Sequence, residues 1–177
     1  VVTGASGHLG RLVVTELLEH GTPAESIVAT ARTPEKLADL AALGVVVRRA
    51  DYTDPQSLKD AFLGADRILL VSSSDFNDRV GQHRAAIEAA VEAGVELLAY
   101  TSILREDTST LLLAEDHRAT EQLIVESGLP YVFLRNSWYL ENYTEQVAVA
   151  LEHHAVLGSA GDGKVSAASR ADYAAAA

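Results

Sequence analysis

Short apolar runs alternate along the chain with longer segments whose apolar residues recur at helical spacing. The short runs are rich in Val, Ile and Leu, which is typical of parallel strands buried on both faces of a sheet. We expect strands at residues 1–3, 27–31, 45–48, 67–72, 96–101 and 131–135. We expect helices at about 8–20, 34–43, 55–63, 77–93 and 113–127. This alternation predicts an α/β fold built on one doubly wound parallel sheet.

Glycine and proline mark the ends of the predicted helices. A glycine follows the last turn of each, where a left-handed residue commonly ends a helix; these are Gly21, Gly44, Gly64, Gly94 and Gly128. Thr33-Pro34 and Asp54-Pro55 each place a capping side chain before a proline at the first helical position.

A glycine triplet, Gly4-Ala5-Ser6-Gly7-His8-Leu9-Gly10, lies where the first strand turns into the first helix. Gly4 permits a tight turn, Gly7 lets the backbone approach a pyrophosphate, and Gly10 lets the helix pack closely on the sheet. The start of the helix then offers unpaired N–H groups to the anion. The spacing is one residue longer than GxGxxG, and a purely structural turn is the alternative. The context favours a dinucleotide-binding Rossmann fold.

Arg32 follows the second predicted strand, at the position that reads the adenosine ribose in such folds. An acidic residue there would bind a free 2′-hydroxyl, whereas a guanidinium suits a 2′-phosphate. The sequence therefore favours NADPH over NADH, and Lys36 can add a second positive charge. The alternative is that Arg32 covers the loop before the next helix.

Small and polar residues follow the other predicted strands at the same edge, where ligands of open α/β sheets bind. They are Asp51, Ser72, Ser73, Ser74, Thr101, Ser102 and Asn136. Asp51 can accept from an adenine amino group, and the serines can contact ribose and phosphates. Each is equally explained as a helix cap or loop residue, so their shared edge carries the inference.

Half of the aromatic residues fall between Tyr131 and Tyr143. Tyr131 and Phe133 alternate along a strand, and we expect them in the core. Trp138, Tyr139 and Tyr143 lie beyond its end, where flat apolar surface can line the nicotinamide and a planar substrate. Plain packing is the alternative explanation for these three.

Composition excludes several functions. The net charge of -11 disfavours nucleic-acid binding, which depends on clustered Lys and Arg. The absence of cysteine excludes a disulfide framework and a thiolate metal site within this sequence. His153 and His154 would point about 100° apart on a helix, so we expect no metal. No stretch approaches the ~20 apolar residues of a membrane span, and we expect a cytoplasmic protein.

The ends of the chain predict a fragment. It begins immediately before a glycine turn, contains no methionine, and ends within a predicted helical turn. We expect residues 1–152 to form the nucleotide-binding domain and 153–177 to begin a smaller C-terminal substrate-binding portion. The oligomeric state is not readable from the sequence, and a homodimer is one open alternative.

Several segments resemble the type 2 NAD(P)H:quinone oxidoreductases of bacteria, an NmrA-like group of atypical short-chain dehydrogenases. They are GASGHLG, ATARTP, ADYTDP, LLVSSS, AYTSILREDTS, LRNSWYLENY and the closing GDGKVSAASRADYAAAA. The resemblance implies NADPH-dependent reduction of quinones by hydride transfer. It also implies cofactor contacts at Gly4, Ala5, Ser6, Gly7, His8, Leu9, Arg32, Ser72, Ser73, Ser74, Asn136, Ser137, Trp138, Tyr139 and Asn142.

Most short-chain dehydrogenases use a serine on the fifth strand and a Tyr-x-x-x-Lys pair on the next helix. Here the matching positions hold Ser102, Leu113 and His117, so the tyrosine acid is missing. Ser102 can hold a carbonyl or simply end the strand. His117 can donate a proton or orient the ribose, or it can be an ordinary polar helix residue.

The missing acid discriminates among reactions. Reducing a ketone creates an alkoxide that needs a positioned acid, whereas a quinone leaves a phenolate-like oxygen, of pKa about 10, that water can protonate. The missing acid therefore fits the quinone reduction that the resemblance implies, and we expect a quinone reductase on that basis. The alternative is a regulator that binds NADP(H) without turnover, and an epimerase or ketone reductase is disfavoured by Leu113.

Overall fold

One parallel sheet runs through the centre of the computed structural model, which describes residues 1–156, 158 and 161–177. Val2 lies in the middle of the sheet and bridges Ala29 on one side and Leu69 on the other. The order is therefore β2, β1, Val2, β3, β4, β5. The strands are β1 (Val28–Ala31), β2 (Val46–Arg49), β3 (Arg67–Leu70), β4 (Leu97–Ile103) and β5 (Tyr131–Asn136). The predicted doubly wound sheet is confirmed, with the first strand reduced to one bridging residue.

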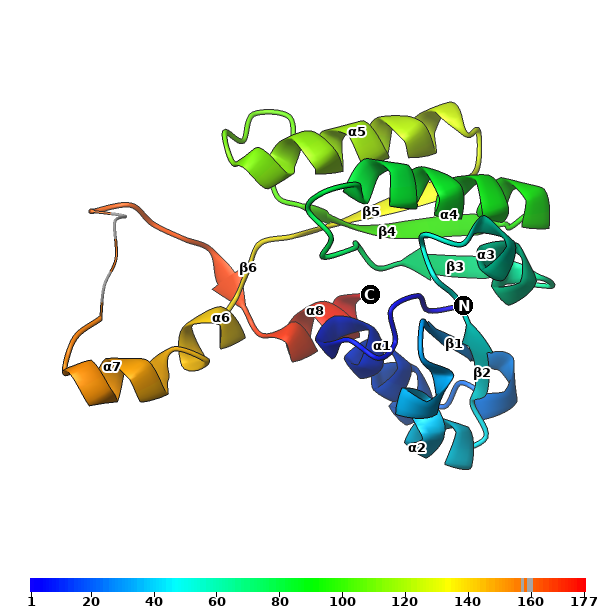
Figure 1. The fold of residues 1–177 in the computed structure, drawn as a ribbon, viewed down its shortest axis with the longest axis horizontal. Helices are drawn as coiled ribbons and strands as arrows, with labels where there is room; N and C mark the ends of the chain where they lie inside the picture. Colours follow the sequence, from blue (N-terminus) through cyan, green and yellow to red (C-terminus); the bar gives the residue numbers. More distant parts are fainter. Residues whose placement is uncertain (157, 159–160) are drawn as a thin grey trace.

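Helices cover both faces of this sheet (Figure 1). One face carries α1 (His8–Glu19), α2 (Ala38–Ala42) and α8 (Arg170–Ala176). The other carries α3 (Pro55–Phe62), α4 (Arg79–Ala93) and α5 (Leu112–Glu126). Successive side chains of β3 point to opposite faces of the sheet and so contribute to both apolar cores. Leu69 packs toward α1, while Ile68 and Leu70 pack toward α4. Two apolar layers thus hold the strand ends in fixed positions.

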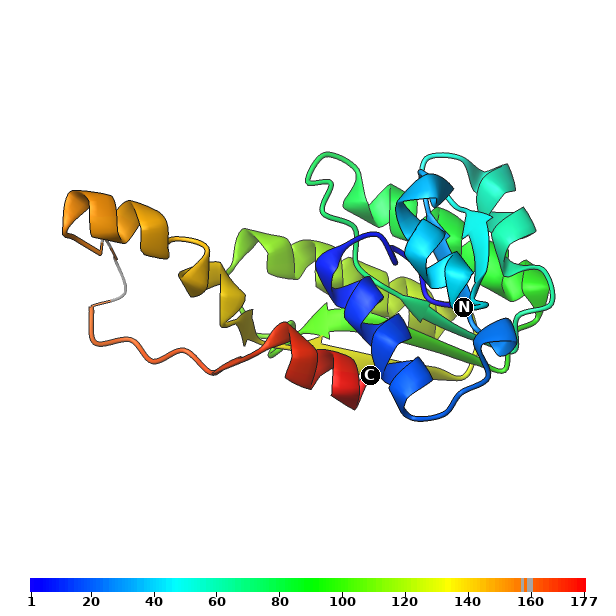
Figure 2. The ribbon, with the colours of Figure 1, turned by 90° about the horizontal axis from the view of Figure 1, so that it is seen from below.

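A two-stranded extension follows β5. In it β6 (Trp138–Tyr139) pairs in parallel with β7 (Ala167–Ala168). Between them, α6 (Glu141–Thr144) and α7 (Val147–His153) project away from the sheet, as both views show (Figure 2). The chain then returns, and α8 packs against α1 with Ala174 buried in the shared core.

Local signals at the helix ends are mostly confirmed. All five predicted end glycines have positive φ angles, between 67° and 93°. Asp54 caps α3, because its carboxylate accepts from the backbone N–H of Ser57 at 3.2 Å. The cap predicted at Thr33 is wrong. The segment starts as a 3-10 turn, Pro34–Leu37, and it is the Thr33 carbonyl that accepts from Lys36 N–H at 3.2 Å.

The expectation that Tyr131 lies in the core is also wrong. Its side chain is 44% exposed and stacks on the ring of Phe133 at 4.6 Å, because β5 is the outermost strand of the described sheet. Phe133 is half-buried and packs on the core beneath α4 and α5, as expected.

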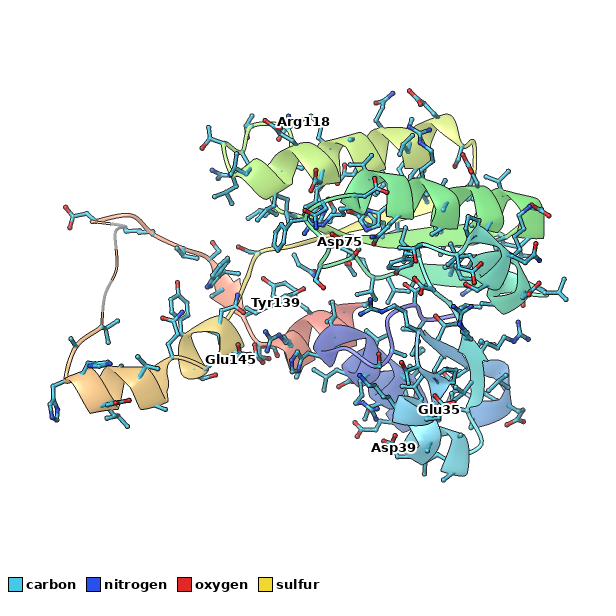
Figure 3. All side chains as sticks on the ribbon, in the orientation of Figure 1. Glu35, Asp39, Asp75, Arg118, Tyr139 and Glu145 are labelled. Atoms are coloured by element: carbon cyan, nitrogen blue, oxygen red, sulfur yellow. The ribbon has the colours of Figure 1, made fainter. Side chains whose placement is uncertain are left out.

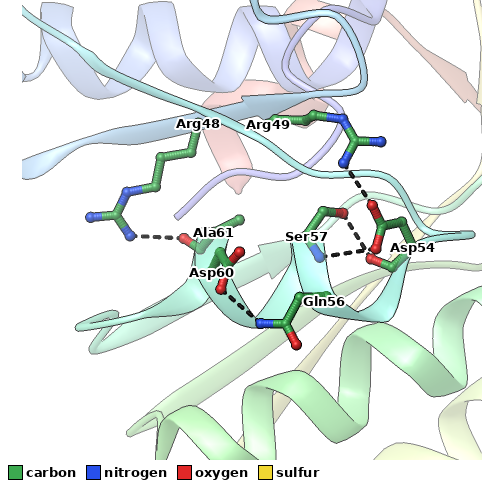
Figure 4. A pocket seen from close by; sticks show the side chains of 7 residues that line it. All are labelled: Arg48, Arg49, Asp54, Gln56, Ser57, Asp60 and Ala61. Atoms are coloured by element: carbon green, nitrogen blue, oxygen red, sulfur yellow. Dashed lines mark hydrogen bonds and ion pairs between the residues drawn. The ribbon is translucent and has the colours of Figure 1, made fainter.

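A small surface depression of about 390 Å³ lies between β2 and α3 (Figure 4). Arg48 Nη1 donates to the carbonyl oxygens of Ala61 and Leu63 at 2.9 and 2.8 Å, which satisfies the last turn of α3. Arg49 pairs with Asp54 at 2.7 Å. These contacts fasten α3 to the sheet. None of the helices in the described ranges is long and apolar enough to cross a bilayer.

Candidate functional site

A cleft of about 1320 Å³ runs along the carboxyl ends of the strands. Its walls come from the glycine turn, the ends of β1 to β5, the loops after β3 and β4, and the β6–α6 segment. Figure 3 labels Asp75 on the β3–α4 loop and Tyr139 on β6, which contribute to two of these walls. The volume exceeds the roughly 300–1,000 Å³ of sites for drug-sized ligands. A larger ligand therefore fits.

The glycine turn forms the floor of the cleft at the start of α1. Gly4 has φ +60°, a backbone conformation that side-chain-bearing residues rarely adopt. A Cβ on Gly10 would lie 2.6 Å from the Gly4 carbonyl oxygen, so only glycine lets α1 pack on the turn. Gly7 precedes α1, and its first turn has no side-chain cap, which leaves backbone N–H groups for an anion.

The residues between the glycines separate into two groups. Ser6, His8 and Leu9 line the cleft together with the three glycines. Ala5 is fully buried behind the turn, and its N–H donates to the Thr30 carbonyl at 2.9 Å. The sequence did not distinguish Ala5 from its neighbours, because only the turn geometry decides which residue faces inward.

Arg32 and Asp51 lie at the β1 and β2 end of the cleft, and both line it. Arg32 is exposed. The pKa of Asp51 is lowered chiefly by the backbone N–H of Thr53, which donates to its carboxylate at 3.0 Å, with contributions from Arg32 and Arg49. A negatively charged Asp51 thus lies near the exposed guanidinium of Arg32. Lys36 is exposed and lies outside the cleft lining.

Ser72, Ser73 and Ser74 follow β3 and all line the cleft. Ser73 is held by α4 through all of its polar groups. Its N–H donates to His83 Nε2 at 2.9 Å, its hydroxyl donates to Gln82 at 2.6 Å, and its carbonyl accepts from Arg79 at 2.7 Å. Ser72 N–H donates to Thr101 Oγ1 at 2.8 Å, so Thr101 ties this loop to β4.

Ser102 is buried at the end of β4, and its hydroxyl has no hydrogen-bond partner among the described residues. It lines the cleft, as do Leu113 and His117 of α5. Thr30 on β1 also lines the cleft with a buried hydroxyl that is unpaired within the described ranges. Buried hydroxyls without partners are costly, which points to a ligand that satisfies them.

His117 is buried, and its Nδ1 atom lies 2.7 Å from the hydroxyl of Tyr100. Burial and then the nearby Arg79 guanidinium lower the pKa of His117 to about 4, although Asp116 and Glu121 act in the opposite direction. The ring is therefore uncharged at neutral pH. Sequence reasoning found His117 but missed Tyr100, because an internal strand residue gives no signal of which helix side chain it will contact.

Aromatic residues of β6 and α6 form the opposite wall. The rings of Trp138 and Tyr143 meet edge to face at 6.5 Å, and both side chains are about half exposed. Tyr139 lies under the guanidinium of Arg170 at 5.3 Å, and its hydroxyl accepts from the Asn136 amide at 3.4 Å. All five residues line the cleft, and the three aromatic rings give it a flat apolar side.

The remaining predicted contacts are engaged with the β7–α8 segment. Ser137 N–H donates to Tyr173 Oη at 3.0 Å, and Ser137 Oγ donates to the Ser166 carbonyl at 2.6 Å. Asn142 Oδ1 accepts from Arg170 at 3.2 Å. Both residues line the cleft. Arg170 itself was missed, since nothing in the sequence places α8 beside α6.

Further lining residues also escaped sequence reasoning. Four of them are large, exposed apolar side chains at the cleft mouth, namely Phe76, Leu104, Leu111 and Val165. The signal available in the sequence was the presence of large apolar residues in segments predicted to be loops. Among the described residues no cluster of His, Asp and Glu has the arrangement of a metal site.

Comparison with known proteins identifies the family. The sequence profile of the NAD(P)H-binding family matches residues 4–177, and the chain belongs to this family. It is 50% identical over 176 residues to Quinone oxidoreductase 2 of Escherichia coli (strain K12), which covers 99% of this chain and 61% of that protein. This likeness confirms the resemblance to type 2 quinone oxidoreductases.

Two solved structures share the fold. The NADPH-dependent quinone oxidoreductase QOR2 from Escherichia coli, complexed with NADPH, matches with a TM-score of 0.94 and 49% identity, over 98% of this chain and 61% of that one. The Citrobacter sp. triphenylmethane reductase, complexed with NADP(H), matches with a TM-score of 0.94 and 39% identity, over 99% and 62%. The fold is thus of the NAD(P)-binding Rossmann type. The chain spans about three-fifths of the length of these relatives.

Proposed function

We propose that the full-length protein is an NADPH-dependent reductase that transfers a hydride to quinones. One observation carries the proposal: a single cleft joins the glycine turn at the start of α1 to the aromatic wall of β6 and α6. Relatives named for quinone reduction and for NADPH binding support it. For the whole protein, the proposal includes a planar, quinone-like acceptor and a cytoplasmic location, and it leaves a homodimer as an open alternative.

The residues of the cleft fit NADPH. The glycine turn leaves room and N–H groups for the pyrophosphate, and Arg32 offers a guanidinium for the 2′-phosphate. The hydroxyls of Thr30 and Ser102 have no partner among the residues that the structure describes, and they lie in walls where ribose and nicotinamide polar groups would satisfy them. Trp138 and Tyr143 offer flat surface beside the reacting end.

Bound NADPH supplies a hydride, which carries two electrons and one proton, and the second proton of the hydroquinone comes from water. The chain itself contributes orientation and exclusion of water. Leu113 and the leucines at the cleft mouth keep the reacting end apolar, and Ser102 can donate to an acceptor oxygen. Because Leu113 cannot exchange protons, substrates whose reduced form is a strongly basic alkoxide are disfavoured.

The test follows NADPH oxidation by the full-length protein through the near-ultraviolet absorbance of the reduced nicotinamide, with and without a simple benzoquinone. NADPH and NADH are titrated first to compare their dissociation constants. We expect oxidation that depends on the quinone and a preference for NADPH. If NADPH is not oxidised, or if its oxidation does not depend on the quinone, the protein is not a quinone reductase.

A second candidate is a regulator that senses NADP(H) without turnover. The observation in its favour is Leu113, which leaves the cleft without the tyrosine acid of most short-chain dehydrogenases. Tight NADPH binding combined with no oxidation of NADPH by several quinones supports the regulator. The two outcomes are distinguished in the same titration and assay.

A further inference from the structure

We propose that His117 meets the electron acceptor as an uncharged hydrogen-bond donor, and that Tyr100 is the positioning residue that fixes its tautomer. The inference rests on the proposed reductase function and deepens it, because it names the group that contacts the acceptor oxygen. In this role His117 gives up no proton, so it acts neither as a general acid nor as a cation.

The geometry separates the two nitrogen atoms of the ring. Tyr100 lies on β4 and is completely buried, and its hydroxyl is 2.7 Å from His117 Nδ1. His117 is only 5% exposed, yet it lines the cleft. Since Nδ1 points at an inaccessible hydroxyl, the edge of the ring that faces the cleft is the opposite one, which carries Nε2.

The Tyr100 hydroxyl determines where the imidazole proton lies. A buried phenol O–H left without an acceptor is costly, and His117 Nδ1 lies 2.7 Å from this hydroxyl. Ser72 and Thr120 also interact with the Tyr100 hydroxyl, but Thr120 Oγ1 is already bonded to His83 and Asp116, so we take His117 as the acceptor. Burial raises the pKa of Tyr100, so the hydroxyl keeps its proton and donates it to Nδ1. A neutral imidazole that accepts at Nδ1 carries its own proton on Nε2, directed at the cleft.

Burial and four titratable neighbours determine whether His117 binds a second proton. From α4 come Arg79 and His83, and from α5 come Asp116 and Glu121. Arg79 is 6% exposed and pairs with Asp116 at 2.9 Å, so this buried cation is partly neutralised but not removed. Burial and Arg79 together prevail over the two carboxylates and lower the pKa of His117.

His83 is uncharged for an independent geometric reason. Its Nε2 atom accepts from Ser73 N–H at 2.9 Å, and a backbone N–H can only donate. The proton of His83 is therefore on Nδ1, which donates to Thr120 Oγ1 at 2.9 Å. The Thr120 hydroxyl in turn donates to the backbone carbonyl oxygen of Asp116 at 2.8 Å. In each of these three hydrogen bonds behind His117, the donor and the acceptor are therefore fixed.

An uncharged donor suits quinone reduction. Negative charge grows on one quinone oxygen as the hydride arrives, and a preorganised N–H stabilises that charge in a water-poor site. Ser102 can add a second donor, because its buried hydroxyl lies in the same cleft. The final proton comes from water, which leaves His117 ready for the next turnover.

The kinetic test compares His117→Gln and His117→Leu in the full-length protein. Glutamine keeps a neutral N–H donor and cannot titrate, so we expect kcat with benzoquinone within about threefold of the parent. Leucine removes the donor, and we expect a loss of about 10- to 100-fold with an unchanged dissociation constant for NADPH. Equal losses in both variants, or a kcat/KM of the parent that falls from about pH 5.5 to about pH 8, overturn the proposal.

The spectroscopic test needs no turnover. Nitrogen-15 spectra of the His117 ring are expected to report the Nε2–H tautomer, unchanged between about pH 5.5 and about pH 8. In Tyr100→Phe, we expect the chain to stay folded and the His117 ring to become a mixture of the Nδ1–H and Nε2–H tautomers. An Nδ1–H ring or titration in this range in the parent protein refutes the role of His117 as an uncharged donor. An Nε2–H ring that is unchanged in Tyr100→Phe refutes the positioning role of Tyr100. If the parent oxidises no NADPH with quinones, the reductase function fails while this spectrum still decides the tautomer.

Discussion

Arg32 lies at the end of β1, exposed and at the rim of the cleft. Lys36 is close in sequence, but it lies outside the cleft lining, and its carbonyl accepts from Arg11 at 2.7 Å. Of the two cations that sequence reasoning associated with a 2′-phosphate, the geometry therefore favours Arg32. This pair offers a matched comparison for nucleotide selectivity.

Replacing Arg32 by alanine is expected to weaken NADPH binding by about 1.5–3 kcal/mol, roughly 10- to 150-fold, because a charge-assisted hydrogen bond to the 2′-phosphate is lost. NADH binding should hardly change. Fluorescence titration of both nucleotides measures the effect, and Lys36→Ala is the control with a smaller loss. Equal weakening of NADPH and NADH by Arg32→Ala excludes the 2′-phosphate assignment.

Gly10 provides the second prediction at this scale. An alanine Cβ would lie 2.6 Å from the Gly4 carbonyl oxygen and 2.9 Å from its carbon, and neither backbone atom can move without opening the turn. We expect Gly10→Ala to destabilise the fold by about 1–3 kcal/mol and to weaken nucleotide binding. Urea unfolding and NADPH titration measure both. Gly158→Ala is the control, since Gly158 is exposed and no atom of the described residues lies within 4 Å of its added Cβ.

At the scale of elements, α4 holds the loop after β3 in place. Arg79, Gln82 and His83 lie within two turns and bind the carbonyl, hydroxyl and N–H of Ser73. One helix therefore fixes the backbone that lines the middle of the cleft. The hydrogen bond between Ser73 and His83 requires an uncharged His83. The pKa of His83 is lowered to about 3, first by burial and then by His117 and Arg79.

This depressed pKa predicts acid sensitivity. In the unfolded chain His83 binds a proton below about pH 6.5, whereas the folded chain binds it only near its lowered pKa. Folding stability should therefore fall with decreasing pH across this window, by up to about 1.4 kcal/mol per pH unit for each such histidine. Urea unfolding at several pH values measures the slope.

His83→Gln is the variant that isolates this effect, because glutamine can accept from Ser73 and donate to Thr120 without titrating. We expect a shallower dependence of stability on pH. His153→Gln is the control, since His153 is exposed on α7. An unchanged slope in His83→Gln shows that other groups cause the acid sensitivity.

At the scale of the whole molecule, α8 joins the aromatic wall to the sheet. Ala174 is buried against α1, whose first turn borders the glycine turn. Tyr173 accepts from Ser137 N–H at 3.0 Å, and Arg170 N–H donates to the Glu141 carboxylate at 2.8 Å. The segment that follows β6 and α6 along the chain thus returns and positions them over the cleft.

Tyr173→Phe removes the acceptor of the Ser137 N–H while keeping the ring that packs on Tyr139. The bond is worth about 1 kcal/mol, so amide exchange at Ser137 is expected to become roughly fivefold faster. Hydrogen exchange followed by NMR measures this rate. Tyr143→Phe is the control and should leave Ser137 exchange unchanged. An unchanged rate in Tyr173→Phe means that Tyr173 does not hold this wall.

Most of the fold was predictable from the sequence because its signals are local. Apolar runs, helical periodicity and five glycines after helices identified the strands and helices up to β5 to within a few residues, with the first strand reduced to one bridging residue. The short elements β6, α6, α7 and β7 were not predicted. The errors have local causes as well. Thr33 does not cap because a 3-10 turn uses its carbonyl instead, and Tyr131 is exposed because its strand lies at the edge of the described sheet.

The sequence by itself determined the glycine turn, the cation at Arg32 and the missing acid at Leu113, because each depends on which residue follows a strand or occupies a helix position. Only the tertiary structure decided which polar groups remain free in the cleft. Ser73 is bound by α4 on every side, whereas the hydroxyl of Ser102 has no partner in the described part of the chain. The Tyr100–His117 contact likewise joins a strand to a helix. Such contacts depend on how helices pack across the sheet, and local periodicity does not encode that packing.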